Sequence, residues 1–187
     1  MKKSVLFSIV LLVVSVISTV SVKAQTYEVG TNVISGGLGL GSSIAGGYTY
    51  GSQSPGISLQ YERGIWEAGP GVISLGGYLG FKSYSYNYNN GNTAYSQKWN
   101  YTIIGARGAY HFTGIEVENL DVYAGLMLGF DNLSYSTSGA GIPGSYGSDL
   151  GLSVFGGARY FFAGNLGGFA EIGYGVSFLS IGLSYKF

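Results

Sequence analysis

Large apolar residues alternate with small or polar residues along most of the chain beyond about residue 28. The last seven residues show this most clearly, because Ile181, Leu183, Tyr185 and Phe187 alternate with Gly182, Ser184 and Lys186. A two-residue period predicts β-strands with two different faces. No stretch of this region shows a convincing 3.6-residue repeat, so the pattern indicates an all-β protein.

The alternation predicts eight strands, which cover about residues 28–41, 56–66, 71–85, 98–112, 120–133, 149–162, 167–175 and 181–187. Long connections at about 42–55, 86–97 and 134–148 alternate with short ones at about 67–70, 113–119 and 163–166. The last connection, near residues 175 and 176, is expected to be short. All three prolines fall in predicted connections, where the missing N–H breaks no strand ladder. This alternation is typical of an up-and-down barrel with long loops at one end and short turns at the other.

The two faces of the strands differ in chemistry, but the alternation alone leaves open which face points inward. A soluble, secreted barrel that binds a small apolar ligand would also alternate, with its large apolar residues inside. Composition favours the opposite arrangement, because charged residues are only 10% of the chain, against about 25% in ordinary soluble domains. Only helices and closed barrels satisfy their backbone polar groups in lipid. The prediction is therefore an all-β, eight-stranded antiparallel up-and-down transmembrane β-barrel.

The predicted inner face carries charged side chains, and unpaired charges in a narrow lumen would be costly. We expect ion pairs there, with Arg107 and Arg159 as bridging residues because a guanidinium can contact several carboxylates. The predicted lumen charges are Glu62, Lys82, Arg107, Asp131, Arg159, Glu171 and Lys186. An eight-stranded barrel is just wide enough for its own side chains to fill, so a filled lumen is expected, and a gated narrow conduit is the alternative.

Aromatic residues recur near the predicted strand ends and suggest two girdles at membrane interfaces. The expected periplasmic girdle consists of Trp66, Tyr110, Phe112, Tyr160, Phe162, Tyr185 and Phe187. The expected opposite girdle consists of Trp99, Tyr101, Phe130 and Tyr174. Further tyrosines lie in the predicted external loops and could contact an extracellular ligand or anchor at headgroup level: Tyr48, Tyr50, Tyr86, Tyr88, Tyr95, Tyr135 and Tyr146.

The N-terminal residues have the pattern of a secretory signal peptide. Lys2 and Lys3 precede an apolar run, and cleavage is expected between Ala24 and Gln25. Residues 1–24 are thus predicted to be removed, and residues 25–187 to form the barrel domain. The chain has no cysteine, which excludes disulfides as a source of stability.

We find no convincing catalytic, cofactor-binding or metal-binding motif, and no basic patch for nucleic acid. His111 is expected to be a lumen or interface residue. Glu116, Glu118 and Asp121 are expected to form a solvated turn that could bind a cation only weakly. The glycine-rich run at residues 36–41 lacks the Lys-Ser/Thr of a phosphate-binding loop and is interpreted as a strand.

The region 25–187 resembles the small eight-stranded outer-membrane proteins of the OmpA/OmpX-like, opacity-type family. The resemblance rests on the C-terminal strand, on the segment 169–175 and on the run 157–162. It implies a location in the outer membrane of a Gram-negative bacterium, contact with outer-membrane lipids and recognition of Ile181, Leu183, Tyr185 and Phe187 by the barrel-insertion machinery. It also implies a monomer with a non-enzymatic structural or adhesion-type role. A narrow channel or a lipid-modifying enzyme is the alternative.

Overall fold

The computed structural model describes residues 27–41, 52–89, 94–138 and 148–187. The predicted leader, residues 1–24 with the cleavage site Ala24–Gln25, lies outside the described residues. None of the described residues forms a helix long and apolar enough to cross a membrane.

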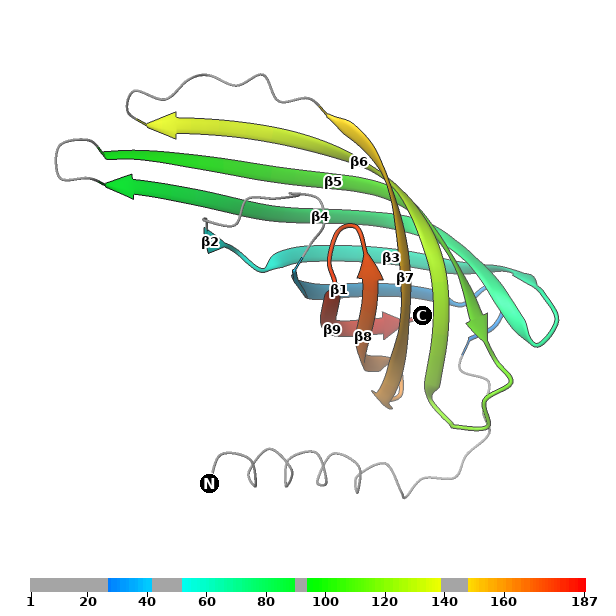
Figure 1. Ribbon diagram of the computed structural model, residues 1–187. Helices are drawn as coiled ribbons and strands as arrows, with labels where there is room; N and C mark the ends of the chain where they lie inside the picture. Colours follow the sequence, from blue (N-terminus) through cyan, green and yellow to red (C-terminus); the bar gives the residue numbers. More distant parts are fainter. Residues whose placement is uncertain (1–26, 42–51, 90–93, 139–147) are drawn as a thin grey trace, which may run out of the picture.

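Strands make up almost all of the described chain (Figure 1). They are β1 (Asn32–Leu40), β2 (Ser52–Gln53), β3 (Gly56–Glu67), β4 (Gly71–Asn89), β5 (Ala94–Phe112), β6 (Leu120–Ser138), β7 (Asp149–Ala163), β8 (Leu166–Tyr174) and β9 (Leu179–Lys186). β2 is a two-residue strand that pairs only with β4. The other eight match the eight predicted strands in order.

These eight strands form a closed antiparallel sheet. Each strand pairs with the next along the chain, and β1 pairs with β9 over Val33–Leu40 and Leu179–Lys186. Closure leaves neither the first nor the last strand as a free edge. The predicted eight-stranded antiparallel up-and-down barrel is confirmed.

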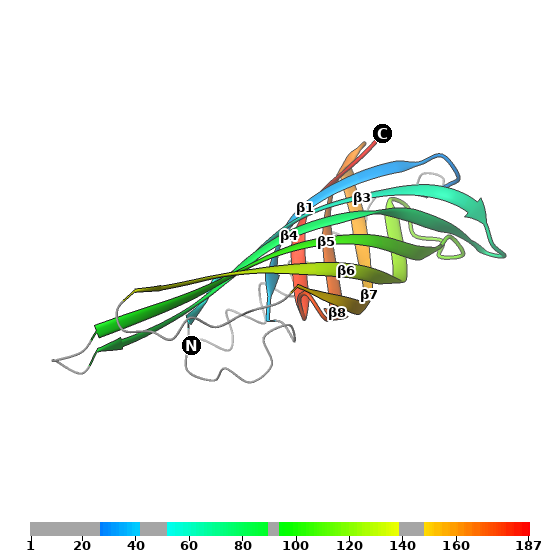
Figure 2. The same ribbon diagram turned by 90° about the horizontal axis from the view of Figure 1, so that it is seen from above.

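Strands β4, β5 and β6 are longer than predicted and project beyond the others as an arm (Figures 1 and 2). We define the arm as residues 82–89, 94–101 and 132–138. β4 and β5 stay paired from Gly71–Phe112 to Asn89–Ala94, and β6 extends to Ser138. The predicted loops are therefore wrong at residues 86–89, 94–97 and 134–138, which are strand. These residues alternate Tyr with Ser or Asn, and without an aliphatic stripe their strand pattern is weak.

The barrel has two different ends. At the base end, short turns join β3 to β4, β5 to β6 and β7 to β8, and the described chain begins and finishes there with Tyr27 and Phe187. At the arm end lie the arm and the connection between β8 and β9. The strand ends that border the three predicted long connections therefore all lie at one end of the barrel.

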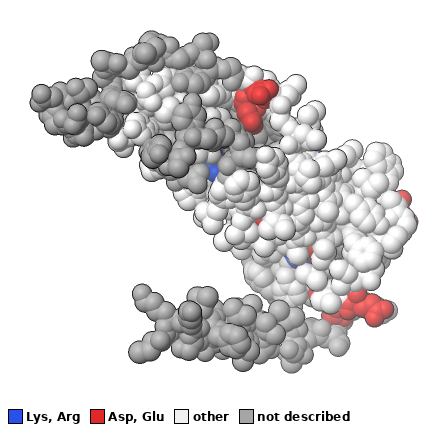
Figure 3. All heavy atoms as spheres, in the orientation of Figure 1, with Lys and Arg blue, Asp and Glu red and all other residues white. Residues whose placement is uncertain are grey.

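Side chains alternate strictly between the lumen and the outer surface. In β3 the polar residues Ser58, Gln60 and Glu62 are buried, whereas Ile57 and Leu59 are exposed. The same holds around the barrel, and the described surface visible in Figure 3 is uncharged over most of its area, with acidic side chains gathered in patches toward its two ends. Large apolar residues are thus displayed outward and charges are enclosed, the reverse of the arrangement in a water-soluble domain.

The outer surface changes from apolar to polar at one level of the sheet. Ile104 faces Phe130 across β5 and β6, and both are exposed; the next outward pair is Thr102 and Asn132. β4 changes at the same level, because Phe81 is its last outward apolar residue. The outer face of the arm beyond it is hydrophilic, with Ser83, Ser85, Asn87, Lys98, Asn100, Ser134 and Ser136.

The seam between the first and last strands is built on glycines. Gly37 lies directly opposite Gly182, and the Phe169 ring packs against both. A Cβ atom at Gly37 would lie 2.7 Å from Phe169 Cζ, and one at Gly182 would lie 2.7 Å from Phe169 Cε1. Both positions must therefore lack a side chain for the ring to lie across the seam.

Candidate functional site

Five charged side chains form one continuous chain of ion pairs across the lumen. Arg107 Nε donates to Glu62 Oε1 at 2.8 Å, and Arg107 Nη2 donates to Glu171 Oε2 at 2.8 Å. Arg159 Nη2 donates to the other oxygen of Glu62, and Arg159 Nη1 donates to Asp121 Oδ2 at 3.1 Å. The order is Asp121–Arg159–Glu62–Arg107–Glu171, and each member comes from a different strand of the barrel. All five are buried.

Aromatic rings cover both guanidinium groups. The Arg107 guanidinium carbon lies 3.9 Å from the centre of the Phe155 ring, and that of Arg159 lies 4.2 Å from the centre of the Tyr123 ring. Tyr123 also donates from its hydroxyl to Glu171 Oε2 at 3.2 Å. Desolvated cation–π contacts of this kind stabilise a buried charge. The arginines are therefore held by carboxylates at their edges and by ring faces above them.

A second hydrogen-bonded series joins this network near the base end. His111 Nδ1 lies 2.7 Å from Asp121 Oδ1, and His111 Nε2 lies 2.9 Å from Ser74 Oγ. Ser74, His111 and Asp121 are all buried. Asp121 therefore belongs to both series, through one oxygen to Arg159 and through the other to His111.

Only some of the predicted lumen charges belong to this ion-pair network. Glu62, Arg107, Arg159 and Glu171 lie in the network just described. Lys82 is buried, but its Nζ donates to the backbone carbonyl of Gly41 at 2.7 Å. Lys186 lies over the Phe161 ring with its Nζ at 4.7 Å from the ring centre.

Other sequence expectations need correction. Asp121 is not part of a solvated turn, because it is the second residue of β6 and its side chain is buried in the lumen. Trp99 and Tyr101 are not members of an outer girdle, because they share the inward face of β5 with Arg107. Tyr101 packs against the inner cluster that contains Ile103. Phe130 and Tyr174, by contrast, are exposed on the outer surface.

The predicted loop tyrosines divide into three groups. Tyr86 and Tyr135 lie in the strands of the arm, together with Tyr84, which is not one of the predicted loop tyrosines. Tyr88 and Tyr95 also lie in strands. Tyr48, Tyr50 and Tyr146 lie outside the described residues.

The arm has an aromatic inner face. The Tyr84 and Tyr101 rings meet edge to face with centres 5.6 Å apart, and the Trp99 and Tyr135 rings lie at 5.6 Å with a tilt of 45°. These four residues alternate with the hydrophilic residues of the outer face. The arm is thus an amphipathic sheet with an aromatic side that continues the lumen wall.

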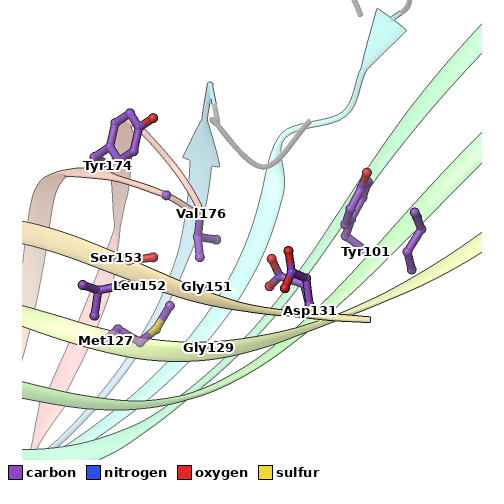
Figure 4. Close-up of a pocket in the computed structure, with 12 residues that line it drawn as sticks. Tyr101, Met127, Gly129, Asp131, Gly151, Leu152, Ser153, Tyr174 and Val176 are labelled. Carbon is purple, nitrogen blue, oxygen red and sulfur yellow. The ribbon is translucent and has the colours of Figure 1, made fainter. Parts of the chain in front are cut away.

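A cavity of about 330 Å³ opens where the arm meets the shorter strands (Figure 4). Tyr101 and Val176 approach it from opposite sides, and Met127 lies beneath. A smaller cavity next to it reaches Arg107 and Glu171. We call this opening the mouth of the barrel, and the ion-pair network forms its floor.

Two carboxylates face each other at the rim of the mouth. Asp131 and Asp149 are direct cross-strand partners of β6 and β7, one position beyond the last outward apolar pair, Phe130 and Leu150. Burial, and next the Asp149 carboxylate, raise the pKa of Asp131. Like charges directly opposite each other are destabilising in a sheet, so Asp131, predicted to be ion-paired, instead contributes to an acidic rim. Among the described residues, no group of three or more His, Cys, Asp or Glu side chains could hold a metal ion.

The closed ring of paired strands decides the architecture. The chain folds as a closed eight-stranded antiparallel barrel. No protein-family model matches it, and no curated protein matches it either. The solved structures to which the chain is similar include two of the Yersinia pestis outer-membrane protein Ail.

The first Ail structure was determined in a phospholipid bilayer nanodisc; it has 15% sequence identity and a TM-score of 0.48, and the match covers 84% of this chain and 99% of that chain. The second is a crystal structure of Ail, the attachment invasion locus protein, in complex with the heparin analogue sucrose octasulfate. It has 13% identity and a TM-score of 0.45, and the match covers 86% of this chain and all of that chain.

Proposed function

We propose that this protein is an integral outer-membrane barrel with a filled lumen and that its arm binds a partner outside the cell. The observation that carries the membrane location is the level at which the outer surface changes from apolar to polar. Below it, exposed residues such as Leu126, Leu128 and Ile104 face outward. A soluble barrel would place such residues inside, so the outward display favours lipid as the surroundings.

This location sets the orientation. The base end with its short turns faces the periplasm, and the arm end faces outward. Residues 1–24 would act as the leader, with cleavage between Ala24 and Gln25. Ile181, Leu183, Tyr185 and Phe187 would meet lipid, and the insertion machinery would recognise them. All four are exposed on the outer surface of the described barrel. The protein would function as a monomer.

Support for a filled lumen comes from the packing on both sides of the charges. Toward the arm end, Tyr78, Ile103, Tyr123, Met127 and Phe155 form one buried cluster. Toward the base end, Tyr27, Val33, Val72 and Phe161 form another. With the ion pairs between them, these clusters favour a closed structural barrel over a channel.

Support for a binding role comes from the arm. Its aromatic inner face provides large, rigid contact areas beside polar groups, as in protein surfaces used for recognition. The rings of this face come from three strands, because Tyr84 lies in β4, Trp99 in β5 and Tyr135 in β6. This aromatic face of the arm supports the binding role.

The binding role is tested by changing one face of the arm at a time. Replacing Trp99 and Tyr135 together by alanine should abolish the adhesion that expression of the protein confers on host bacteria. The matched control replaces Asn100 and Ser134, the neighbouring cross-strand pair on the outer face, and should leave adhesion unchanged. Adhesion is counted on gelatin-coated, heparin-coated and bare polystyrene. Gel migration that shifts on heating, together with outer-membrane fractionation, shows that every variant is folded and in place.

If neither the parent protein nor the control increases attachment to any of the three surfaces, the adhesion role is wrong. Equal loss from both double variants would instead show that the aromatic face has no specific part in binding.

A second candidate function is hydrolysis of an acyl ester by Ser74. The observation that favours it is the hydrogen-bond order Ser74–His111–Asp121, in which a base contacts the nucleophile and a carboxylate orients the base. In such a reaction the Ser74 proton moves to His111 as Oγ bonds to the acyl carbon, and the leaving alkoxide takes that proton as its bond to the acyl carbon breaks. A water then gives a proton to His111 and its oxygen bonds to the acyl carbon, and Ser74 leaves with the proton from His111, which releases the carboxylic acid. However, Ser74 is wholly buried, and neither cavity at the mouth includes it in its lining.

We therefore expect no covalent adduct on Ser74 when the folded protein is treated with a fluorophosphonate probe and digested for mass spectrometry. The same treatment of a soluble serine hydrolase serves as the positive control. An adduct that maps to Ser74 and disappears in His111→Gln would establish the hydrolase instead, since loss of the base alone would then stop the reaction.

A further inference from the structure

Tyr27 fills the base end of the lumen although it lies before the first strand. Its side chain is 1% exposed and packs with Val33, Val72 and Phe161. Its ring is stacked on His111, with ring centres 3.6 Å apart and planes 1° from parallel. The tyrosine thus enters the barrel from below and covers the histidine of the polar series.

The short segment that carries Tyr27 is fastened to the barrel by backbone hydrogen bonds. Gly30 N donates to Gly64 O at 2.9 Å, and Gly64 N donates to Thr31 O at 3.0 Å. Within the segment, Glu28 N donates to Thr31 Oγ1 at 3.1 Å and Thr31 N to Glu28 O at 3.1 Å. These contacts form a tight turn that aims residue 27 back into the lumen.

The barrel wall is adapted to this segment. The register of β3 against β4 shifts between Gly64 and Trp66, which marks a bulge at this place. A Cβ atom on Gly64 would overlap the carbonyl oxygen of Glu28. The segment can therefore lie where it does only because residue 64 is glycine.

The slot that holds the ring is apolar and aromatic. Its walls are two aliphatic side chains, the Phe161 ring and the face of His111. The Tyr27 hydroxyl is buried and has no hydrogen-bond partner among the described residues. A flat aromatic ring therefore fits these surroundings through its faces and edges.

We propose that the base end of the lumen is a binding slot for a flat aromatic ring, which Tyr27 occupies as a stopper that seals the charged network from the periplasm. The stopper is independent of what the arm binds. The proposal explains why Tyr27, which lies outside the strands, is as buried as Phe161 inside the barrel.

The absence of cysteine from the chain allows a direct test by thiol labelling. Val72→Cys places a thiol beside the Tyr27 ring, and Ile103→Cys places a similarly buried thiol in the other cluster. Both variants are purified in detergent and exposed to N-ethylmaleimide, and the labelling rate is followed by intact mass. Adding Tyr27→Ala to Val72→Cys should speed labelling by roughly tenfold or more, because local opening becomes easier. Adding it to Ile103→Cys should leave the rate unchanged.

Three further experiments, each in the Val72→Cys background, distinguish the loss of the stopper from a general destabilisation of the barrel. Tyr27→Phe keeps the ring and should keep the thiol at position 72 protected. Gly64→Ala leaves Tyr27 intact but displaces its segment, and it should speed labelling as Tyr27→Ala does. Millimolar p-cresol, the side-chain fragment of tyrosine, should slow labelling again in Tyr27→Ala. The proposal is overturned if the thiol at position 72 reacts at the same rate with and without Tyr27, or if the thiol at position 103 is accelerated equally.

Discussion

Replacing Arg159 by methionine should lower the free energy of unfolding by about 3–5 kcal/mol, because it leaves buried carboxylates without their partner. Arg159 contacts both Glu62 and Asp121 and is fully enclosed. Without it, Asp121 keeps only His111 and Glu62 keeps only Arg107. Methionine fills much of the same volume, so the expected loss comes mainly from charge and hydrogen bonding and less from a cavity.

The measurement is reversible urea unfolding in phospholipid vesicles. Arg63→Met is the matched control, because Arg63 is exposed on the outer side of β3 and directly follows Glu62. Arg159→Lys should have an intermediate effect, since an ammonium keeps the charge but not the two-pronged geometry. Adding Asp121→Asn to Arg159→Met should recover part of the loss, because it removes one uncompensated carboxylate. Equal stability of the Arg159→Met and Arg63→Met proteins would contradict the structural importance of the network.

Replacing Leu126 by arginine should destabilise the barrel in a bilayer by about 2–4 kcal/mol, because a charge on the lipid-facing side near the midplane must leave water. Leu126 is 54% exposed and lies halfway along the outward apolar residues of β6, which run from Val122 to Phe130. Its neighbours across the sheet are Gly108 and Val154, neither of which can pair with a cation.

Asn132→Arg is the control on the same strand and face, beyond the change from apolar to polar, where the cost should fall to about 0–1 kcal/mol. Both variants are unfolded with urea from the same vesicles. If Leu126→Arg costs no more than Asn132→Arg, then lipid does not cover this face. That result would also reject the proposed membrane location, whatever the arm binds.

The strands and their faces could be predicted because both are local properties of the sequence. Alternation in residues 56–62 places Glu62 and Ile57 on opposite faces, and the low charge content of the chain then indicates that Glu62 is inside. The network could be predicted only in part, because its contacts join residues far apart in the chain, such as Arg159 with Glu62. Sequence spacing contains no information on which inward residues share a level in a closed barrel, since that depends on the stagger of the strands.

Some errors came from assigning residues by type and not by position. Trp99 and Tyr101 have the same parity as Arg107, so extending the inward face of β5 along the strand would have placed them inside. The polar arm was missed for another reason: its outer face is hydrophilic and its inner face is built of tyrosine and tryptophan, so the usual aliphatic stripe of a strand is missing. Tyr27 gave no signal, because it precedes the predicted strand at 28–41 and is placed in the lumen by contacts with residues far along the chain, such as His111 and Phe161.

The glycine seam has a consequence for the time course of folding. Hairpins such as β4 with β5 pair segments that are close in the sequence. β1, by contrast, pairs with β9 about 150 positions away, as the hydrogen bond between the Ser35 and Ser184 hydroxyls shows. Loop closure over so many residues carries a large entropic cost and is slow. Phe169 can settle on Gly37 and Gly182 only once these strands have met. The Phe169 ring therefore packs late in folding, and it stabilises the pairing of β1 with β9 as soon as that pairing forms.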